Sequence, residues 1–255
     1  MRLSRTSLNK AVAAVALGTG VAAGTASAGL VYDLRFSDGS HSRQADAGTT
    51  YTLELWAQVS GTNATQSDEK LTNTYVNIVS TQVGGGNIVA GGLAAATVAT
   101  PFDGAGFRAG GPGDLNSDGV IDWGSTSTAA ANTNYMFTRT NTVGGELGGT
   151  TGQDADGIGP GLTWEWKIAT FTVNAAAVGA GQTRFNIVKP AATSFVAVNY
   201  AVAAVDNVNF LVSQTNQQGA YTGSQGVTFM PIPEPASVGL LGVAAIGLLG
   251  RKRRK

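Results

Sequence analysis

The stretch Leu30-Val31-Tyr32-Asp33-Leu34-Arg35-Phe36 decides the fold class, because large apolar and polar side chains alternate along it. Successive residues of an extended chain point to opposite sides, so the apolar side chains share one face while Asp33 and Arg35 lie on the other. Residues 51–59 repeat the pattern, with an apolar side chain at every second position. Both segments therefore predict β-strands that bury one face.

Further strand signals lie in two blocks, about residues 30–100 and 160–215, on either side of a loop-like middle of about 101–161. Glycine-containing turns separate the strands, and outside the two ends of the chain we find no 3.6-residue period of helix length. Each block alone has too few strands to close a core. We therefore expect one all-β domain, an antiparallel β-sandwich with a long loop insertion. The additional predicted strands are 74–81, 88–98, 164–173, 184–188, 195–202 and 205–212.

The composition excludes several classes of function. The chain has no cysteine, which excludes thiol catalysis and thiolate metal sites. Of the 16 basic and 16 acidic residues, 8 basic and 1 acidic lie in the two ends, which leaves residues 29–229 with a net charge of −7. A nucleic-acid-binding face must be basic, so this charge argues against nucleic acid as a partner.

The N-terminal segment 1–28 predicts a signal peptide. Three basic residues up to Lys10 precede a small apolar run, and Ala26-Ser27-Ala28 fits the small-x-small rule for cleavage. A short buried amphipathic helix is the alternative, but the run has no polar face. We expect the mature chain, a passenger domain of residues 29–229, to start at Gly29.

The C-terminal segment 230–255 has three parts: Pro233-Glu234-Pro235, an apolar run of 15 residues at 236–250, and five consecutive basic residues. A full membrane span needs about 20 apolar residues, so the run predicts a short transmembrane helix. That helix would be either a marginal anchor that is retained or a temporary one that processing removes. A terminal core helix of the domain is the alternative, but it would bring five cations beside the core.

This order of motif, apolar run and basic tail resembles the PEP-CTERM sorting signal of bacterial exported proteins. The resemblance implies that a membrane-embedded sorting enzyme of the exosortase type recognises Pro233, Glu234 and Pro235. It also implies a protein of the cell envelope or cell surface that is anchored in the membrane at least transiently. The resemblance covers only the tail and implies nothing about the activity of the passenger.

Residues 163–173 and 183–187, joined by a Gly-rich turn, resemble a strand pair of cohesin-like and carbohydrate-binding-module sandwiches. For a carbohydrate-binding module the resemblance implies an extracellular polysaccharide as partner. The tryptophans would then form a sugar-stacking platform, although packing in the core is the more general role of such residues. They are Trp56, Trp123, Trp164 and Trp166.

Residues 114–122 match the front of an EF-hand-type calcium loop and resemble dockerin-type loops. Position 12 of the motif is Ser125 instead of an acid, and no helical pattern flanks the loop, so calcium binding is expected to be weak. The alternative is a surface loop held by its own side chains. The oxygen ligands would come from Asp114, Asn116, Asp118, the carbonyl of Val120, and Asp122.

A catalytic set is not evident in the sequence. His41 is the only histidine, which excludes a zinc site with two imidazoles. Glu54, Glu165 and Asp206 lie in predicted strands, and two of them could in principle act on a glycosidic bond, but sequence spacing does not bring any pair together. We therefore predict a non-enzymatic, exported envelope protein without a cofactor other than calcium, as a structural or adhesive matrix component. A carbohydrate-binding module and an envelope glycan hydrolase are the alternatives.

Overall fold

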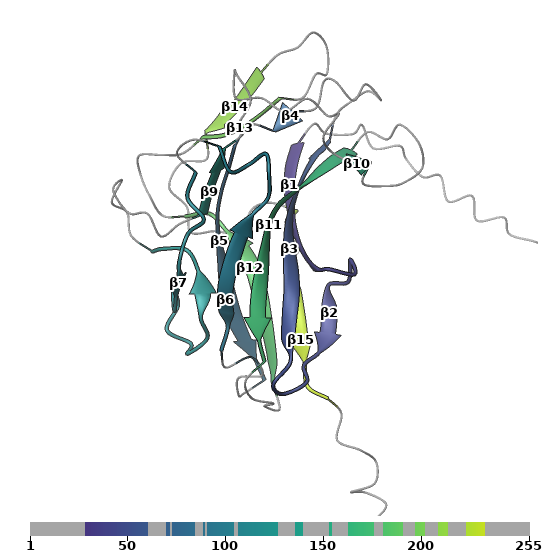
Figure 1. Ribbon diagram of the computed structural model, residues 1–255, viewed down its shortest axis with the longest axis vertical. Helices are drawn as coiled ribbons and strands as arrows, with labels where there is room; N and C mark the ends of the chain where they lie inside the picture. The colour runs from purple at the N-terminus through teal and green to yellow at the C-terminus, as the bar shows by residue number, and fades with distance from the viewer. Residues whose placement is uncertain are drawn as a thin grey trace, which may run out of the picture.

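A computed structural model describes residues 29–60, 70–71, 73–84, 89, 91–104, 107–126, 136–139, 153–154, 163–175, 181–190, 197–201, 209–213 and 223–232. All regular structure in these ranges is β, which confirms the predicted class (Figure 1). The predicted signal peptide, 1–28, and the predicted hydrophobic helix, 236–250, lie outside the described residues. The first strand begins at Gly29, the expected first residue of the mature chain.

The first sheet is antiparallel and is built around two long strands. β3 (Thr50–Ser60) pairs with β11 (Thr163–Asn174), and a bulge between Lys167 and Ala169 interrupts their register. The outer neighbours are β1 (Gly29–Phe36) beside β3, and β6 (Leu93–Val98) and β10 (Gln153–Asp154) beside β11. The two sequence blocks therefore share one sheet, because β3 comes from the first block and β11 from the second.

The second sheet mixes parallel and antiparallel pairs. It runs in the order β2-β15-β12-β5-β8-β7, and only the β15–β2 pair is parallel. An additional strand, β9, pairs antiparallel with the first residues of β5. A small third sheet has the order β14-β13-β4. The bounds are β2 (Ser42–Gln44), β4 (Lys70–Leu71), β5 (Asn73–Val83), β7 (Pro112–Gly113), β8 (Asp122–Trp123), β9 (Met136–Arg139), β12 (Gln182–Val188), β13 (Ala197–Ala201), β14 (Asn209–Ser213) and β15 (Val227–Met230).

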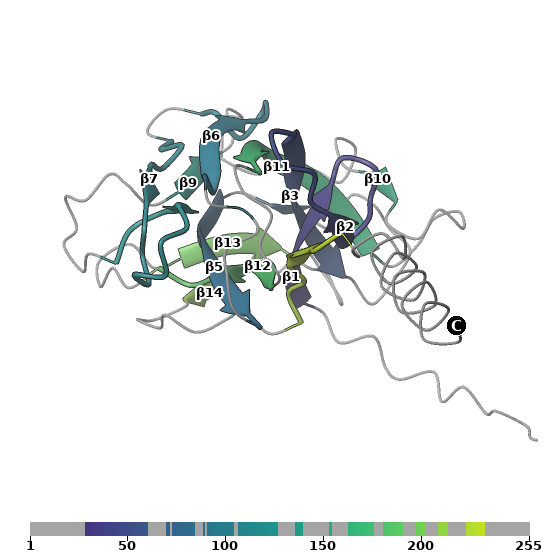
Figure 2. The ribbon, with the colours of Figure 1, turned by 90° about the horizontal axis from the view of Figure 1, so that it is seen from below.

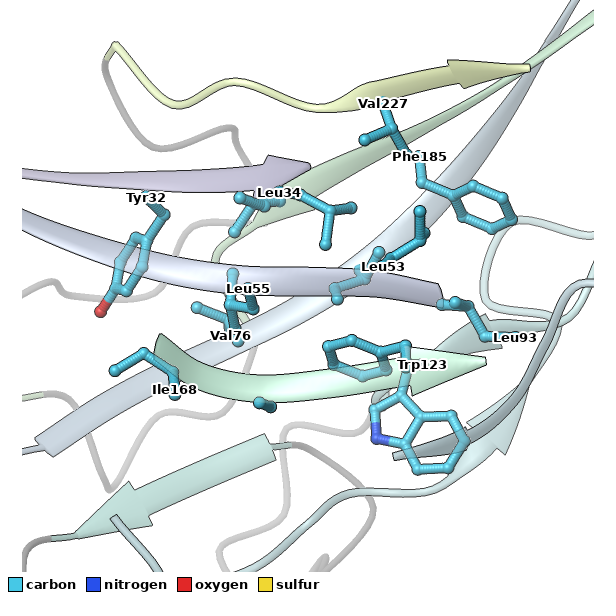
Figure 3. Close-up of a cluster of buried hydrophobic side chains, with 14 of the residues drawn as sticks. Tyr32, Leu34, Leu53, Leu55, Val76, Leu93, Trp123, Ile168, Phe185 and Val227 are labelled. Carbon is cyan, nitrogen blue, oxygen red and sulfur yellow. The ribbon is translucent and has the colours of Figure 1, made fainter. Parts of the chain in front are cut away.

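One hydrophobic core lies between the first and second sheets (Figure 3). Phe36 of β1 meets Phe229 of β15 edge to face, with ring centroids 5.0 Å apart. Trp123 of β8 meets Phe171 of β11 in the same way at 5.9 Å. These pairs join residues of opposite sheets, so the arrangement is sandwich-like. The core-facing apolar residues of the two alternating segments that define the fold class are buried, apart from the half-buried Leu30.

Each of the predicted strands has a counterpart, but the middle of the chain is more structured than the predicted loop insertion. The described part of residues 101–161 contributes β7, β8, β9 and β10 to the sheets. It also contributes buried apolar side chains to the core, namely those of Phe102, Val120, Trp123 and Met136. Strands of two to four residues are too short to show an alternation, so the sequence pattern did not reveal them.

The last strand was also not predicted. β15 lies between β12 and β2, and its carbonyl at Met230 accepts a hydrogen bond from the backbone N–H of Ala45 at 3.0 Å. The strand is short and follows a glycine-rich polar segment, which hides its pattern. Met230, the predicted first residue of the sorting tail, therefore still belongs to the folded domain.

Candidate functional site

The acidic loop 114–122 forms a side wall between the two sheets. Val120 is completely buried in the core, and the carbonyl of Ile121 accepts a hydrogen bond from the N–H of Leu93, the first residue of β6, at 2.8 Å. At the next residue the chain enters β8, which pairs with β5 of the second sheet. The loop therefore connects the edge of one sheet to the edge of the other.

The front of this loop is held by its own side chains. The carboxylate of Asp114 accepts hydrogen bonds from the N–H groups of Asp118 and Gly119, at 3.1 and 3.0 Å. Ser117 has a φ of 61° and Gly119 one of 83°, so the chain reverses sharply between the motif's first and sixth positions. An ionised carboxylate offers about four lone-pair sites, so these hydrogen bonds leave acceptor capacity on Asp114.

Asp122, the last predicted ligand, has a structural role in this geometry. Its side chain is fully buried and accepts hydrogen bonds from the N–H of Ser80 on β5 at 2.6 Å and of Leu115 at 2.8 Å. Burial raises the pKa of the Asp122 carboxyl above its usual value, although the hydrogen bonds from Ser80 and Leu115 oppose the shift. Asp122 thus ties the loop to the edge of β5.

Ser80 makes two further contacts with the loop through its side chain and its carbonyl. Its hydroxyl donates to the carboxylate of Asp118 at 3.0 Å, and its carbonyl accepts from the amide of Asn116 at 2.7 Å. Ser125, at motif position 12, is buried, and its backbone exchanges two hydrogen bonds with the side chain of Asn77. Among the described residues, no three His, Asp or Glu side chains cluster as metal ligands do. Calcium binding by Asp114, Asn116, Asp118, Val120 and Asp122 stays a prediction.

The four tryptophans occupy two different environments. Trp123, Trp164 and Trp166 are buried in the core, so they cannot form a sugar-stacking platform on the surface. Trp56 lies on the opposite, outer face of β3 and is partly exposed. Sequence alternation predicts this difference for Trp56, because its neighbours Leu55 and Ala57 face the core.

Around Trp56 the outer face of the first sheet carries a network of charged and polar side chains. The guanidinium of Arg35 lies 4.1 Å from the centroid of the Trp56 ring. Arg35 donates two hydrogen bonds to Glu165, at 3.1 and 2.8 Å, and Gln58 donates a third at 3.1 Å. We call Arg35, Glu54, Trp56, Gln58, Glu165 and Lys167 the charged face.

The carboxylates of the charged face are bound to cations. Glu165 is only 3% exposed and pairs with Arg35, while Glu54 accepts hydrogen bonds from Lys167 at 3.2 Å and from the indole N–H of Trp56 at 3.0 Å. The Nε2 of His41 lies 2.6 Å from a carboxylate oxygen of Asp33, while the His41 side chain is 38% exposed. Asp206 lies outside the described residues. These pairings are those of structural ion pairs. They give no support to the alternative that the protein is a glycan hydrolase.

The chain leaves the sandwich directly after β15. Pro231 and Ile232 are the last described residues, and Ile232 is 40% exposed. The processing residues Pro233, Glu234 and Pro235 follow at once but lie outside the described part, as do Ala26 and Ala28. In the residues that the structure covers, no helix is long and apolar enough to cross a membrane.

The fold, together with the point where the chain leaves it after β15, defines a class of protein: an all-β, sandwich-like domain followed by a C-terminal tail. Residues 231–255 match the family model of the PEP-CTERM protein-sorting motif, which confirms the resemblance of the tail. The chain therefore carries the kind of signal that marks exported, membrane-associated proteins of the cell envelope for an exosortase. The motif covers the tail alone. A search of curated proteins returned no match to the chain.

Proposed function

We propose that this protein is a non-enzymatic structural or adhesive component of the bacterial cell surface or its extracellular matrix. Its signal peptide directs export, and its C-terminal segment holds it in the membrane until an exosortase-type enzyme acts at Pro233, Glu234 and Pro235. The sandwich, a single domain over residues 29–229 extended by Met230, is the cargo that this tail delivers.

One observation carries the proposal. The last strand of the domain ends at Met230, and the sorting motif begins at the next residue. β15 is not an edge strand but lies between β12 and β2, so a pull on the tail reaches the second sheet through backbone hydrogen bonds on both sides of the strand. This connection suits a domain that is displayed at a surface by its C-terminus.

The intact mass of the protein recovered from the envelope of its cells tests this proposal. A chain that starts at Gly29 and ends near Pro235 is the expected product of export followed by sorting. The variant Glu234→Ala should keep its tail, and the matched variant Ser237→Ala, just beyond the motif, should be processed normally. Recovery of a full-length chain with Met1 and Lys255 from the cytosol would contradict the proposal.

Binding of an extracellular polysaccharide is the second candidate, and Trp56 is the observation that favours it. Among the four tryptophans, Trp56 alone lies on the outer face of a sheet, between the cations of Arg35 and Lys167. Stacking of a sugar needs an aromatic ring that solvent can reach, and of the four tryptophans only Trp56 is partly exposed. Retention on immobilised envelope polysaccharide should be lost in Trp56→Ala and kept in Trp56→Phe. Equal retention of all three proteins would remove this candidate.

A further inference from the structure

Three strands of the second sheet have one of their ends at the same level, beside the point where the chain leaves the domain. β5 and β15 end there, and β12 begins there. Gln82, Thr183 and Phe229 stand opposite one another across β5, β12 and β15. The next residues, Val83, Gln182 and Met230, therefore form the last row on the outer face of this sheet. Figure 1 shows β2, β5 and β15 pointing to this end, and Figure 2 looks onto it. We call Val83, Gln182, Met230 and Ile232 the exit end.

The exit end carries no charged side chain, and three of its four residues, Val83, Met230 and Ile232, are apolar. Val83 is 50% exposed and Ile232 40%, and both belong to the few large hydrophobic side chains that are exposed among the described residues. The sequence between Val83 and Leu93 and that between Asn174 and Gln182 contain no charged residue. A cation, Arg184, lies one row behind, opposite Thr81 and Thr228. Exposed apolar side chains with a cation one row behind them have the chemistry of a surface that meets a lipid interface.

The tail keeps this end close to any membrane in which it is inserted. The chain covers the six steps from Met230 to Ala236, the first residue of the apolar run, in at most about 20 Å. Three of the five intervening residues are proline, a residue that favours an extended chain. The headgroup layer occupies roughly 5–8 Å of that reach. The domain therefore cannot move far from the lipid surface.

We propose that the exit end rests on the lipid headgroups while the tail is inserted, an inference that depends on the membrane insertion stated above. Residues 29–229 carry a net charge of −7, so an anionic surface repels most faces of the domain. The exit end can approach because none of its four residues is acidic. The exposed Asp46 lies nearby, next to Ala45, whose N–H donates to the carbonyl of Met230. Val83 and Ile232 then enter the interface, and Arg184 reaches the lipid phosphates at headgroup depth.

Single fluorescent labels in the full chain test this orientation, because the protein has no cysteine of its own. An environment-sensitive dye is attached to Val83→Cys or to the matched control Thr126→Cys. Thr126 is exposed and lies beside Val188, about 20 Å along β12 from the exit end. The chain recovered from cell membranes is reconstituted into vesicles of phosphatidylethanolamine and phosphatidylglycerol. A blue shift and loss of quenching by iodide are expected at position 83 and not at position 126.

Two measurements separate this inference from the proposed function. Flotation of the vesicles reports insertion of the tail, and the variant Leu241→Arg with Ile246→Arg should abolish both flotation and the shift at position 83. Flotation together with equal quenching at positions 83 and 126 overturns the orientation alone. Absence of flotation overturns the insertion on which it depends. Protection of position 83 only after an exosortase-type enzyme is added assigns the exit end to a protein contact and overturns the lipid contact.

Discussion

Arg35 on β1 donates two hydrogen bonds to Glu165 on β11, at 3.1 and 2.8 Å, although β3 lies between these strands. The two side chains therefore span three strands on the outer face of the first sheet. Glu165 is 3% exposed, so it is a buried carboxylate, and Arg35 and Gln58 both donate hydrogen bonds to it. The ion pair is well placed to fix the position of β1 relative to β11.

Removal of the arginine should destabilise the domain. Arg35→Met removes the cation that donates two hydrogen bonds to the buried Glu165 carboxylate, and we expect a loss of about 3 kcal/mol in the free energy of unfolding. The double variant Arg35→Met with Glu165→Leu should lose less than the single variant. Lys167→Ala breaks a pair whose lysine is 42% exposed and should cost only about 0–1 kcal/mol. Urea unfolding measures all three, and equal losses for Arg35→Met and Lys167→Ala would contradict this role.

Asp122 should hold the side wall in place. The amide of Asp122→Asn cannot accept hydrogen bonds at both of its terminal atoms, so the N–H of either Ser80 or Leu115 loses its partner. We expect a loss of about 1–3 kcal/mol in the free energy of unfolding. Ser117→Ala changes the exposed tip of the same loop and serves as the control. A stability of Asp122→Asn equal to that of the parent would show that the loop is held by other contacts.

The Asp122 carboxyl should also make the free energy of unfolding depend on pH, and its raised pKa fixes the direction of this dependence. Because burial raises its pKa above the usual 3.8, the folded state binds this proton more tightly than the unfolded state does. The contribution to stability is therefore greatest below about pH 3.8 and decreases as the pH rises through the raised pKa. The stability of the parent relative to Asp122→Asn should thus be larger at pH 4 than at pH 7. The opposite slope in paired urea titrations would show a lowered pKa.

Gly92 should be intolerant of any side chain. Its φ is 60°, and a Cβ atom there would lie 2.3 Å from the carbonyl oxygen of Ile121, where the side wall meets β6. We expect Gly92→Ala to cost about 3 kcal/mol, from backbone strain and displacement of the loop together. Gly39 has a similar φ of 82° but open space around it, so Gly39→Ala should cost only about 1–2 kcal/mol. Similar melting temperatures for the two variants would contradict the close approach at Gly92.

Calcium binding by residues 114–122 can be tested by thermal melting. If the dissociation constant is near the weak extracellular range, about 5 mM calcium should add about 1 kcal/mol, or roughly 2–4 °C in melting temperature. Asp114→Asn removes a charge from the first ligand position and should reduce the shift. Magnesium and a chelator are the controls. An unchanged melting temperature in calcium would leave the loop as a purely structural wall.

A comparison of the strands shows which parts of this fold the amino-acid sequence predicts and which it does not. The alternation in Leu30–Phe36 and Tyr51–Val59 predicts the inward and outward faces of β1 and β3, since side-chain direction in a strand is a local property. The sequence did not predict β7, β8 and β15, because strands of two to four residues are too short to show an alternation. Strands this short form only where a neighbouring strand supplies hydrogen-bond partners. Trp56 was separable from Trp164 and Trp166 by alternation, but Trp123 needed the structure, because its strand is two residues long.

The sequence by itself determined the all-β class, the face of each long strand and the sorting tail, because alternation, hydrophobicity and charge order are carried by neighbouring residues. Only the tertiary structure decided that Arg35 reaches Glu165, that Asp122 is buried beneath Ser80, and that Val83 stands level with Met230. These relationships depend on which strands pair and in which register. Strand pairing is settled by contacts between residues far apart in the chain, and a local pattern does not identify the partner strand.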